Sequence, residues 1–204
     1  MSRSRRARLR GDGGAVMAET ALALPVILLL VFGVVEFSFA WRADNRLDSA
    51  TANGARSGAA AGSSTYADRD VLVSILASLP PDLAANLDRV VIYKSTTANG
   101  AVPTNCVPAF GNTSNTGVNG SCNSYSGQFV RSVSTSTTAG FGGSAGDNDR
   151  YWAPSTRKDT VTGPPDYLGV YVRTTYADRT GTFWSDIRLT DTAVFRVQPD
   201  FTGF

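Results

Sequence analysis

The chain has 204 residues, a formal charge of +2 and no histidine. Without histidine it cannot use Ser-His or Cys-His catalysis, and it lacks the commonest zinc ligand. The charge is divided unequally: five arginines and one aspartate give residues 1–14 a charge of +4, so the remaining residues carry −2. Nothing after residue 14 forms the dense basic patch expected of a dedicated nucleic-acid binder.

An apolar segment follows this basic leader. Residues 20–35 contain no charged side chain and consist mainly of Leu, Val, Ala, Ile and Phe. With its weakly polar flanks the segment has about 26 residues, or roughly 40 Å as a helix, which is enough to cross a bilayer. Arginines beside a membrane segment tend to stay in the cytoplasm. We therefore expect a single-pass protein of the cytoplasmic (inner) membrane, with its N-terminus inside and the chain after Trp41 outside.

The junction between leader and apolar segment carries a second signal. Gly14 closes the leader, and Glu19 is the fifth residue after it. Basic leader, glycine and glutamate at this spacing resemble the processing site of type IV pilin-like proteins, and most of all the TadE-like minor pseudopilins of tight-adherence (Tad/Flp) pili. The resemblance implies that a prepilin peptidase cuts between Gly14 and Ala15, which makes residues 1–14 a leader outside the fold. It also implies that Glu19 draws a new subunit into register during assembly.

A conventional secretory signal is the alternative for this region. The small residues of Ser38-Phe39-Ala40 would permit a cut after Ala40. However, the apolar run is longer than the usual core of about 7–15 residues, and Glu19 interrupts its start. We therefore favour prepilin-type processing.

The helix is expected to continue outward, so that residues 15–62 form one element. Small residues recur every four positions in this continuation, at Ala50, Gly54, Gly58 and Gly62. Such a stripe permits close approach to another helix or to a sheet. A flexible Ala/Gly-rich connector, above all from Gly58 onward, is the alternative. Residues 50–59 also resemble the Ala/Gly/Arg segment that follows the membrane helix in TadE-like proteins.

Residues 63–204 are predicted to form one exported α+β domain. Tyr66–Leu79 places its apolar residues on one helical face, and Pro80-Pro81 ends the helix. Residues 88–94 are rich in β-branched side chains, and residues 168–176 alternate between apolar and polar, as strands do. A last strand from Ile187 would close an antiparallel hairpin, which loosely resembles the end of a TadE-like domain. The predicted fold is a long N-terminal, pilin-like transmembrane helix followed by a helix packed on an antiparallel sheet.

The middle of the domain, residues 95–149, is rich in Ser, Thr, Asn and Gly. We expect a surface insertion with little core of its own. Cys106 and Cys122 are the only cysteines, and such a pair in an exported domain predicts one disulfide.

Two motifs in the same region resemble catalytic or metal sites. Residues 142–146 match the G-x-S-x-G pattern of a nucleophile elbow, but they lie in a low-complexity stretch of a chain without histidine. Asp147 and Asp149 lack the spacing of an EF-hand loop, so we interpret them as a solvated acidic turn.

Together these features predict a structural protein and not an enzyme. The expected function is that of a minor pseudopilin that contributes to assembly of a Tad/Flp-type pilus, and hence to adhesion or DNA uptake. The resemblance implies as partners a prepilin peptidase, other pilin and pseudopilin subunits, the Tad-type machinery and the membrane. No cofactor, metal or stable small-molecule ligand is expected.

Two alternatives come from other classes of protein. One is a membrane-anchored surface-binding module whose residues 95–149 contact a ligand outside any filament. The other is a secreted hydrolase, for which the sequence offers no credible catalytic group.

The first testable prediction concerns processing. Cleavage after Gly14 should leave Ala15 as the N-terminus of the membrane-extracted protein, because the basic leader is removed as a unit. N-terminal sequencing checks this. A start at Trp41 would instead indicate an ordinary secretory signal and a soluble product.

Overall fold

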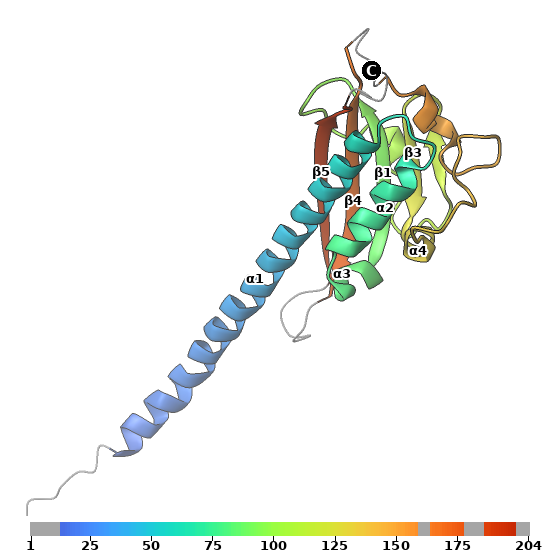
Figure 1. The fold of residues 1–204 in the computed structure, drawn as a ribbon. Helices are drawn as coiled ribbons and strands as arrows, with labels where there is room; N and C mark the ends of the chain where they lie inside the picture. Colours follow the sequence, from blue (N-terminus) through green and yellow to red (C-terminus); the bar gives the residue numbers. More distant parts are fainter. Residues whose placement is uncertain (1–12, 159–163, 178–185, 199–204) are drawn as a thin grey trace, which may run out of the picture. The chain divides into compact units, whose positions relative to one another are not determined.

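The computed structural model describes residues 13–158, 164–177 and 186–198 (Figure 1). The chain divides into two compact units, Met1–Phe39 and Ala40–Phe204. Helix α1 (Gly13–Ala61) has 49 residues and contributes to both units. The predicted long N-terminal helix is therefore confirmed, and it continues through Pro25, as membrane helices allow.

In its described residues the second unit contains three further α-helices and three short 3₁₀ helices. The α-helices are α2 (Ala67–Ser78), α3 (Pro81–Ala85) and α4 (Gly127–Ser132), and the 3₁₀ helices are η1 (Thr104–Cys106), η2 (Arg150–Trp152) and η3 (Pro154–Thr156). Helix α2 confirms the helix predicted from its apolar face, since Val71, Leu72 and Ile75 are fully buried. Pro81 follows α2 and opens α3, at a position where its missing N–H is not needed.

One antiparallel sheet forms the centre of this unit. Its strands are β1 (Leu87–Ser95), β2 (Thr116–Val118), β3 (Cys122–Ser126), β4 (Tyr167–Tyr176) and β5 (Ile187–Arg196), in the order β2-β3-β1-β4-β5. Strands β4 and β5 pair over ten residues, which confirms the predicted closing hairpin. Residues 178–185, which connect β4 to β5, lie outside the described residues. The α+β fold class is confirmed.

The alternation predicted for β4 decides which side chains reach the helical layer. Leu168, Val170, Val172 and Thr174 are fully buried. The Thr174 hydroxyl donates a hydrogen bond of 2.8 Å to the Leu83 carbonyl of α3. Leu168 reaches α1, since a Cβ atom added to Gly58 would lie 3.2 Å from Leu168 Cδ1, and Figure 1 shows the C-terminal part of α1 and α2 in front of the sheet. The apolar row of the strand therefore forms the core between the sheet and the helices.

The stripe of small residues brings α1 against α2. A Cβ atom added to Gly54 would lie 2.5 Å from Ile75 Cγ1, and one added to Gly58 would lie 2.5 Å from Val71 Cγ2. Real Cβ atoms do not approach carbon that closely, so these positions leave room only for hydrogen. Ala50 is fully buried as well.

Gly62 has a different role from the other members of the stripe. It follows the last residue of α1, adopts a φ of +55°, and donates its N–H to the Gly58 carbonyl at 3.1 Å. A glycine in the left-handed region at this position terminates a helix. The α1 helix therefore stays regular through Gly58 and stops at Gly62.

The expectation that residues 95–149 have little core of their own was wrong. Strand β3 lies within this segment, and all five of its residues are buried. It pairs with β1 in the interior of the sheet. Tyr125 also stacks near Phe129 and Phe141, with ring centroids 5.9 and 6.2 Å away. The composition misled because the few apolar side chains of this segment are concentrated in the core and are supplemented there by buried hydrogen bonds.

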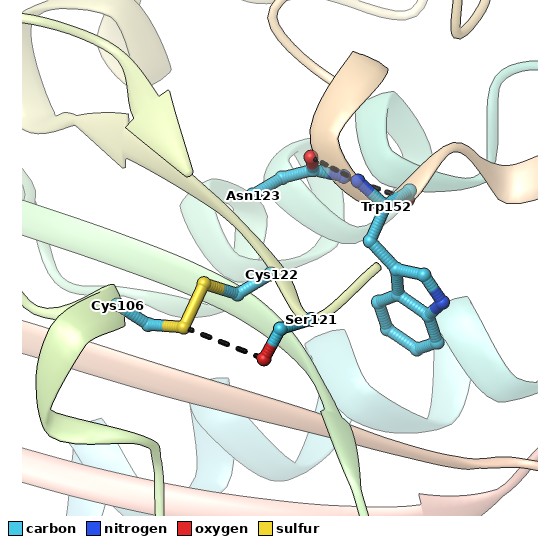
Figure 2. The surroundings of a disulfide bond; sticks show 5 residues. All are labelled: Cys106, Ser121, Cys122, Asn123 and Trp152. Atoms are coloured by element: carbon cyan, nitrogen blue, oxygen red, sulfur yellow. Dashed lines mark hydrogen bonds between the residues drawn. A yellow bond between two sulfur atoms is a disulfide. The ribbon is translucent and has the colours of Figure 1, made fainter. Parts of the chain in front are cut away.

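The predicted disulfide joins Cys106 of η1 to Cys122 of β3 (Figure 2). Both cysteines are buried and belong to a small core with Val91 and Tyr93. The bond closes a loop with a sequence separation of 16 residues. In the chain-entropy picture such a loop contributes about 3 kcal/mol by restricting the unfolded chain. The disulfide anchors the loop that contains η1 to the face of the sheet opposite the helices.

The second testable prediction concerns the contact of α1 with α2. Gly58→Leu should lower the free energy of unfolding by about 1–3 kcal/mol, because the new side chain overlaps Val71. Ala60→Leu is the matched control, since Ala60 is exposed on the same helical turn and should change stability little. Thermal unfolding of the detergent-solubilised protein measures both. Equal melting temperatures for the two variants would contradict the close helix contact.

Candidate assembly helix and buried polar cluster

The first unit presents an apolar surface with one acidic side chain. Among its described residues, large apolar side chains are strongly exposed along α1, for example Met17 and Leu22 at 77 %. Gly14, Ala15 and Glu19 are exposed on the same part of the helix. A shallow hollow on the helix surface is lined by Glu19, Thr20, Ala23, Leu24 and Ile27. Glu19 therefore borders apolar side chains on an exposed surface of the helix.

An apolar surface of this extent is unfavourable in water. Exposed apolar area of this extent marks a membrane or an association site. Among the described residues, one helix is long and apolar enough to cross a membrane. The Thr20 hydroxyl donates a hydrogen bond of 2.8 Å to the Val16 carbonyl, so its polarity is satisfied within the helix. A carboxylate cannot be satisfied in that way, because its oxygens accept hydrogen bonds and donate none.

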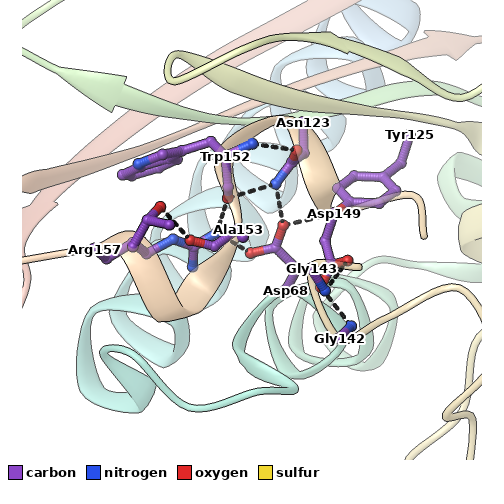
Figure 3. Close-up of polar contacts among 10 residues, drawn as sticks. Asp68, Asn123, Tyr125, Gly142, Gly143, Asp149, Trp152, Ala153 and Arg157 are labelled. Carbon is purple, nitrogen blue, oxygen red and sulfur yellow. Dashed lines mark hydrogen bonds and ion pairs between the residues drawn. The ribbon is translucent and has the colours of Figure 1, made fainter. Parts of the chain in front are cut away.

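The second unit contains a buried polar cluster that the sequence analysis did not predict (Figure 3). Asp68 of α2 forms an ion pair with Arg157, and both side chains are fully buried. Asp68 Oδ2 also accepts hydrogen bonds of 2.8 Å from Asn123 Nδ2 and 2.6 Å from the Tyr125 hydroxyl. The Arg157 guanidinium lies 4.4 Å from the centre of the Trp152 ring. The cluster thus joins α2, strand β3 and the segment around η2 and η3.

Asn123 links the cluster to the backbone of η2. Its side-chain amide donates to the Trp152 carbonyl and accepts from the Trp152 N–H, both at 2.9 Å, as Figures 2 and 3 show. This double hydrogen bond imitates the pairing of a neighbouring strand. Burial, followed by the charge of Asp68, raises the pKa of Tyr125 well above its usual value, so the phenol stays protonated and keeps donating.

Asp149 organises the glycine-rich loop beside this cluster. Its carboxylate accepts hydrogen bonds of 2.9 Å from Gly142 N–H and 2.8 Å from Gly143 N–H, and it is fully buried. Both glycines have positive φ values, +140° and +73°, which few other residues adopt. Burial raises the pKa of Asp149, while the two backbone hydrogen bonds act against that rise. The interpretation of a solvated acidic turn was therefore wrong for Asp149.

The G-x-S-x-G pattern follows from this loop geometry. Gly142 and Gly143 permit the backbone to wrap around the Asp149 carboxylate. Ser144 is exposed, and its N–H donates to Asp147 at 3.0 Å. Within the described part of the chain, no group of three or more His, Cys, Asp or Glu side chains could hold a metal ion. The motif is thus accounted for as loop structure.

Sequence reasoning missed the polar cluster because its members are far apart in the chain. Asp68 is 55 residues from Asn123 and 89 residues from Arg157. No local motif links such positions. One available signal was Asp68 itself. It is the second residue of α2 and the one charged residue on the buried face of that helix.

The third testable prediction concerns Asp68. Asp68→Asn should destabilise the protein by about 3–5 kcal/mol, because it leaves the buried Arg157 charge without its counter-ion. Asp70→Asn is the matched control on the same helix, since Asp70 forms only a partly exposed pair with Arg69 and should cost at most about 1 kcal/mol. Chemical denaturation of the two variants provides the comparison. A similar small loss for both would mean that the Arg157 charge is stabilised without Asp68.

Comparison with known proteins locates the resemblance on the N-terminal helix. Residues 14–56 match the family model described as TadE-like protein. No curated protein and no solved structure matches the chain. The matched residues include Gly14, Glu19 and the stripe positions Ala50 and Gly54. The resemblance seen in the sequence is confirmed over residues 14–56, the part of the chain that is similar to TadE-like proteins.

Proposed function

We propose that this chain is a structural minor pseudopilin that takes part in assembly of a Tad/Flp-type pilus. The observation that carries the proposal is Glu19, an exposed carboxylate on an exposed apolar helix, within the segment that matches the TadE-like family. A filament of this kind would serve surface adhesion or DNA uptake. The role requires no catalytic group or cofactor, in keeping with a chain that has no histidine.

The proposed topology follows from charge and from the disulfide. The arginines of residues 1–14 hold the inner end of α1 in the cytoplasm, so the second unit lies outside the cytoplasmic membrane. The Cys106–Cys122 disulfide supports this arrangement, because disulfides persist mainly in exported domains. A prepilin peptidase would then remove the leader between Gly14 and Ala15.

Cleavage creates the group that Glu19 needs as a partner. The new α-amine of Ala15 carries a positive charge at the membrane boundary. Opposite charges about 4 Å apart attract far more strongly away from bulk water than in it. The amine of a neighbouring subunit can therefore neutralise Glu19 and set the axial position of one apolar helix against the next. The partners would be other pilin and pseudopilin subunits and the Tad-type machinery.

Two simpler arrangements compete with this pairing. Glu19 could pair with the amine of its own chain, or its side chain could extend to the lipid headgroups. In either arrangement the carboxylate would be tolerated but would contribute nothing to the contact between subunits. Assembly distinguishes these cases from the proposed one.

The fourth testable prediction is the effect of Glu19→Ala. Cleavage after Gly14 should largely persist and the protein should accumulate in the membrane, while its incorporation with partner pilins falls at least tenfold. Thr20→Ala is the matched control on the adjacent exposed position, because the Thr20 hydroxyl is already bonded to its own helix. Immunoblots of membranes and of sheared pili measure processing and incorporation.

Two outcomes of this experiment would contradict the proposal. Normal piliation with Glu19→Ala would show that the carboxylate is only a tolerated polar residue. Mature membrane protein that keeps Met1 or Ser2 at its N-terminus would favour the membrane-anchored surface-binding module.

A further inference from the structure

Strand β5 forms a long free edge of the sheet. It lies at the end of the order β2-β3-β1-β4-β5 and pairs only with β4 among the described residues. Its ten residues pair without any register irregularity, whereas β2 at the opposite edge has three residues. Long regular edges are uncommon, because they invite pairing with other chains. Proteins usually shorten, bulge or cover them.

The backbone hydrogen bonds show which residues of β5 point outward. Val197 N–H donates to the Asp166 carbonyl at 2.9 Å, and the register places these two residues opposite each other. In an antiparallel ladder, hydrogen-bonded residues alternate along the strand. The odd-numbered residues of β5 therefore bond to β4, and the even-numbered residues direct their N–H and C=O groups away from the sheet. We call the latter the outward row; it comprises Arg188, Thr190, Thr192, Val194 and Arg196.

Helix α1 supports this assignment and closes one end of the edge. Gln198, the next even-numbered residue, donates its N–H to the Ala59 carbonyl of α1 at 2.9 Å. The orientation deduced from Val197 thus predicts the direction of the Gln198 bond correctly. Helix α1 therefore blocks the edge from Gln198 onward. The outward row itself makes no backbone hydrogen bond to another described residue. With respect to residues 13–158, 164–177 and 186–198, the five residues of the outward row therefore offer unpaired backbone donors and acceptors.

The side chains of the outward row have a defined charge pattern. Arg188 and Arg196 are exposed at its two ends, about 27 Å apart along the strand. Thr190 and Thr192 lie exposed between them, and the row contains no acidic residue. The Arg188 guanidinium lies 4.6 Å from the centre of the Phe110 ring, which holds it over the sheet face.

We propose that a β-strand of a different subunit adds to β5 through the outward row, with acidic side chains facing Arg188 and Arg196. Opposite charges on facing strands stabilise a sheet, and like charges destabilise it. This pattern disfavours a second copy of β5 in the self-pairing centred on Thr192, because that register places Arg188 opposite Arg196 at both ends of the strand. The self-pairing centred on Asp191 places two aspartates opposite each other but also Arg196 opposite Asp186, so the experiment has to distinguish a second copy from a different subunit. The inference rests on the proposed assembly role only for the presence of a neighbouring subunit.

Site-specific photo-crosslinking in cells that carry the native pilus system tests the inference. The full-length protein would carry a photoreactive phenylalanine at Thr190 or at Thr192, with its disulfide intact. The same group at Leu22 reports helix contacts of the first unit, and at exposed Asn86 it serves as a control away from the edge. Mass spectrometry then locates the residue to which each probe attaches.

The inference predicts which residues of the partner become crosslinked, and not only that a partner is crosslinked. The probes at Thr190 and Thr192 should attach to one and the same different subunit. Moving the probe by two residues should shift its attachment site by two residues along that partner. Both attachment sites should lie between acidic side chains, and Asn86 should give no such product.

Two backbone and charge variants sharpen this test. Thr190→Pro removes an outward N–H without removing a bond to β4, so it should lower crosslinking from Thr192 at least tenfold. Thr190→Ala keeps the N–H and should change it less than twofold. If the proline variant fails to form its disulfide, the double variant Arg188→Glu and Arg196→Glu replaces it, because it leaves the backbone unchanged and should cause a comparable loss.

Several outcomes would overturn the inference. Attachment of the Thr190 and Thr192 probes to a second copy of this chain would make β5 a homodimer edge. Crosslinks from Leu22 without any from the outward row would refute strand addition and leave the proposed assembly role intact. Absence of crosslinks from Leu22, Thr190 and Thr192 would contradict both the strand addition and the proposed assembly role. Equal crosslinking in Thr190→Pro and Thr190→Ala would show that the outward N–H groups are not used.

Discussion

Helix α1 can belong to the core of the second unit because Gly54 and Gly58 carry no side chains where α2 packs against it. Further toward its N-terminus the same helix is mainly apolar and largely exposed. A helix of that kind normally has no reason to enter a folded domain. The glycines provide the reason, because they let Val71 and Ile75 of α2 approach its backbone. Each glycine costs nearly 1 kcal/mol of helix propensity relative to alanine, which the contact has to offset.

The polar cluster solves a second problem of the same unit. Strand β3 has the sequence Cys-Asn-Ser-Tyr-Ser, which carries too little apolar surface to hold a strand in the interior of a sheet. Asn123 and Tyr125 compensate by bonding to Asp68, and Asn123 also bonds to the Trp152 backbone. Each of these bonds is strengthened by its buried surroundings, and each would be costly to leave unmade. The disulfide at Cys122 adds a covalent restraint at the start of the same strand.

The glycine contact and the polar cluster both belong to the second unit, so the two units differ in what stabilises them. The described residues of the first unit form an exposed apolar helix with one exposed carboxylate, the surface on which the proposed membrane and subunit contacts depend. The second unit is held internally by a glycine contact, a buried ion pair and a disulfide, so its surface is available for other contacts. On that surface, the outward row of β5 presents backbone donors and acceptors that have no partner among the described residues, and such groups bind only at fixed spacing and direction.

The sequence by itself determined the features that depend on local pattern. The uncharged run at residues 20–35 specifies a membrane-length helix, the Gly14 and Glu19 spacing indicates the TadE-like family, and the alternation in β4 identifies its buried face. The tertiary structure alone decided the place of β3, the burial of Asp149 and the direction of the outward row. Each of these depends on partners distant in sequence, such as Asp68 for Asn123. Hydrogen bonds between residues far apart leave no periodic trace in composition, so the Ser/Thr/Asn-rich middle resembled a surface insertion until its partners were placed.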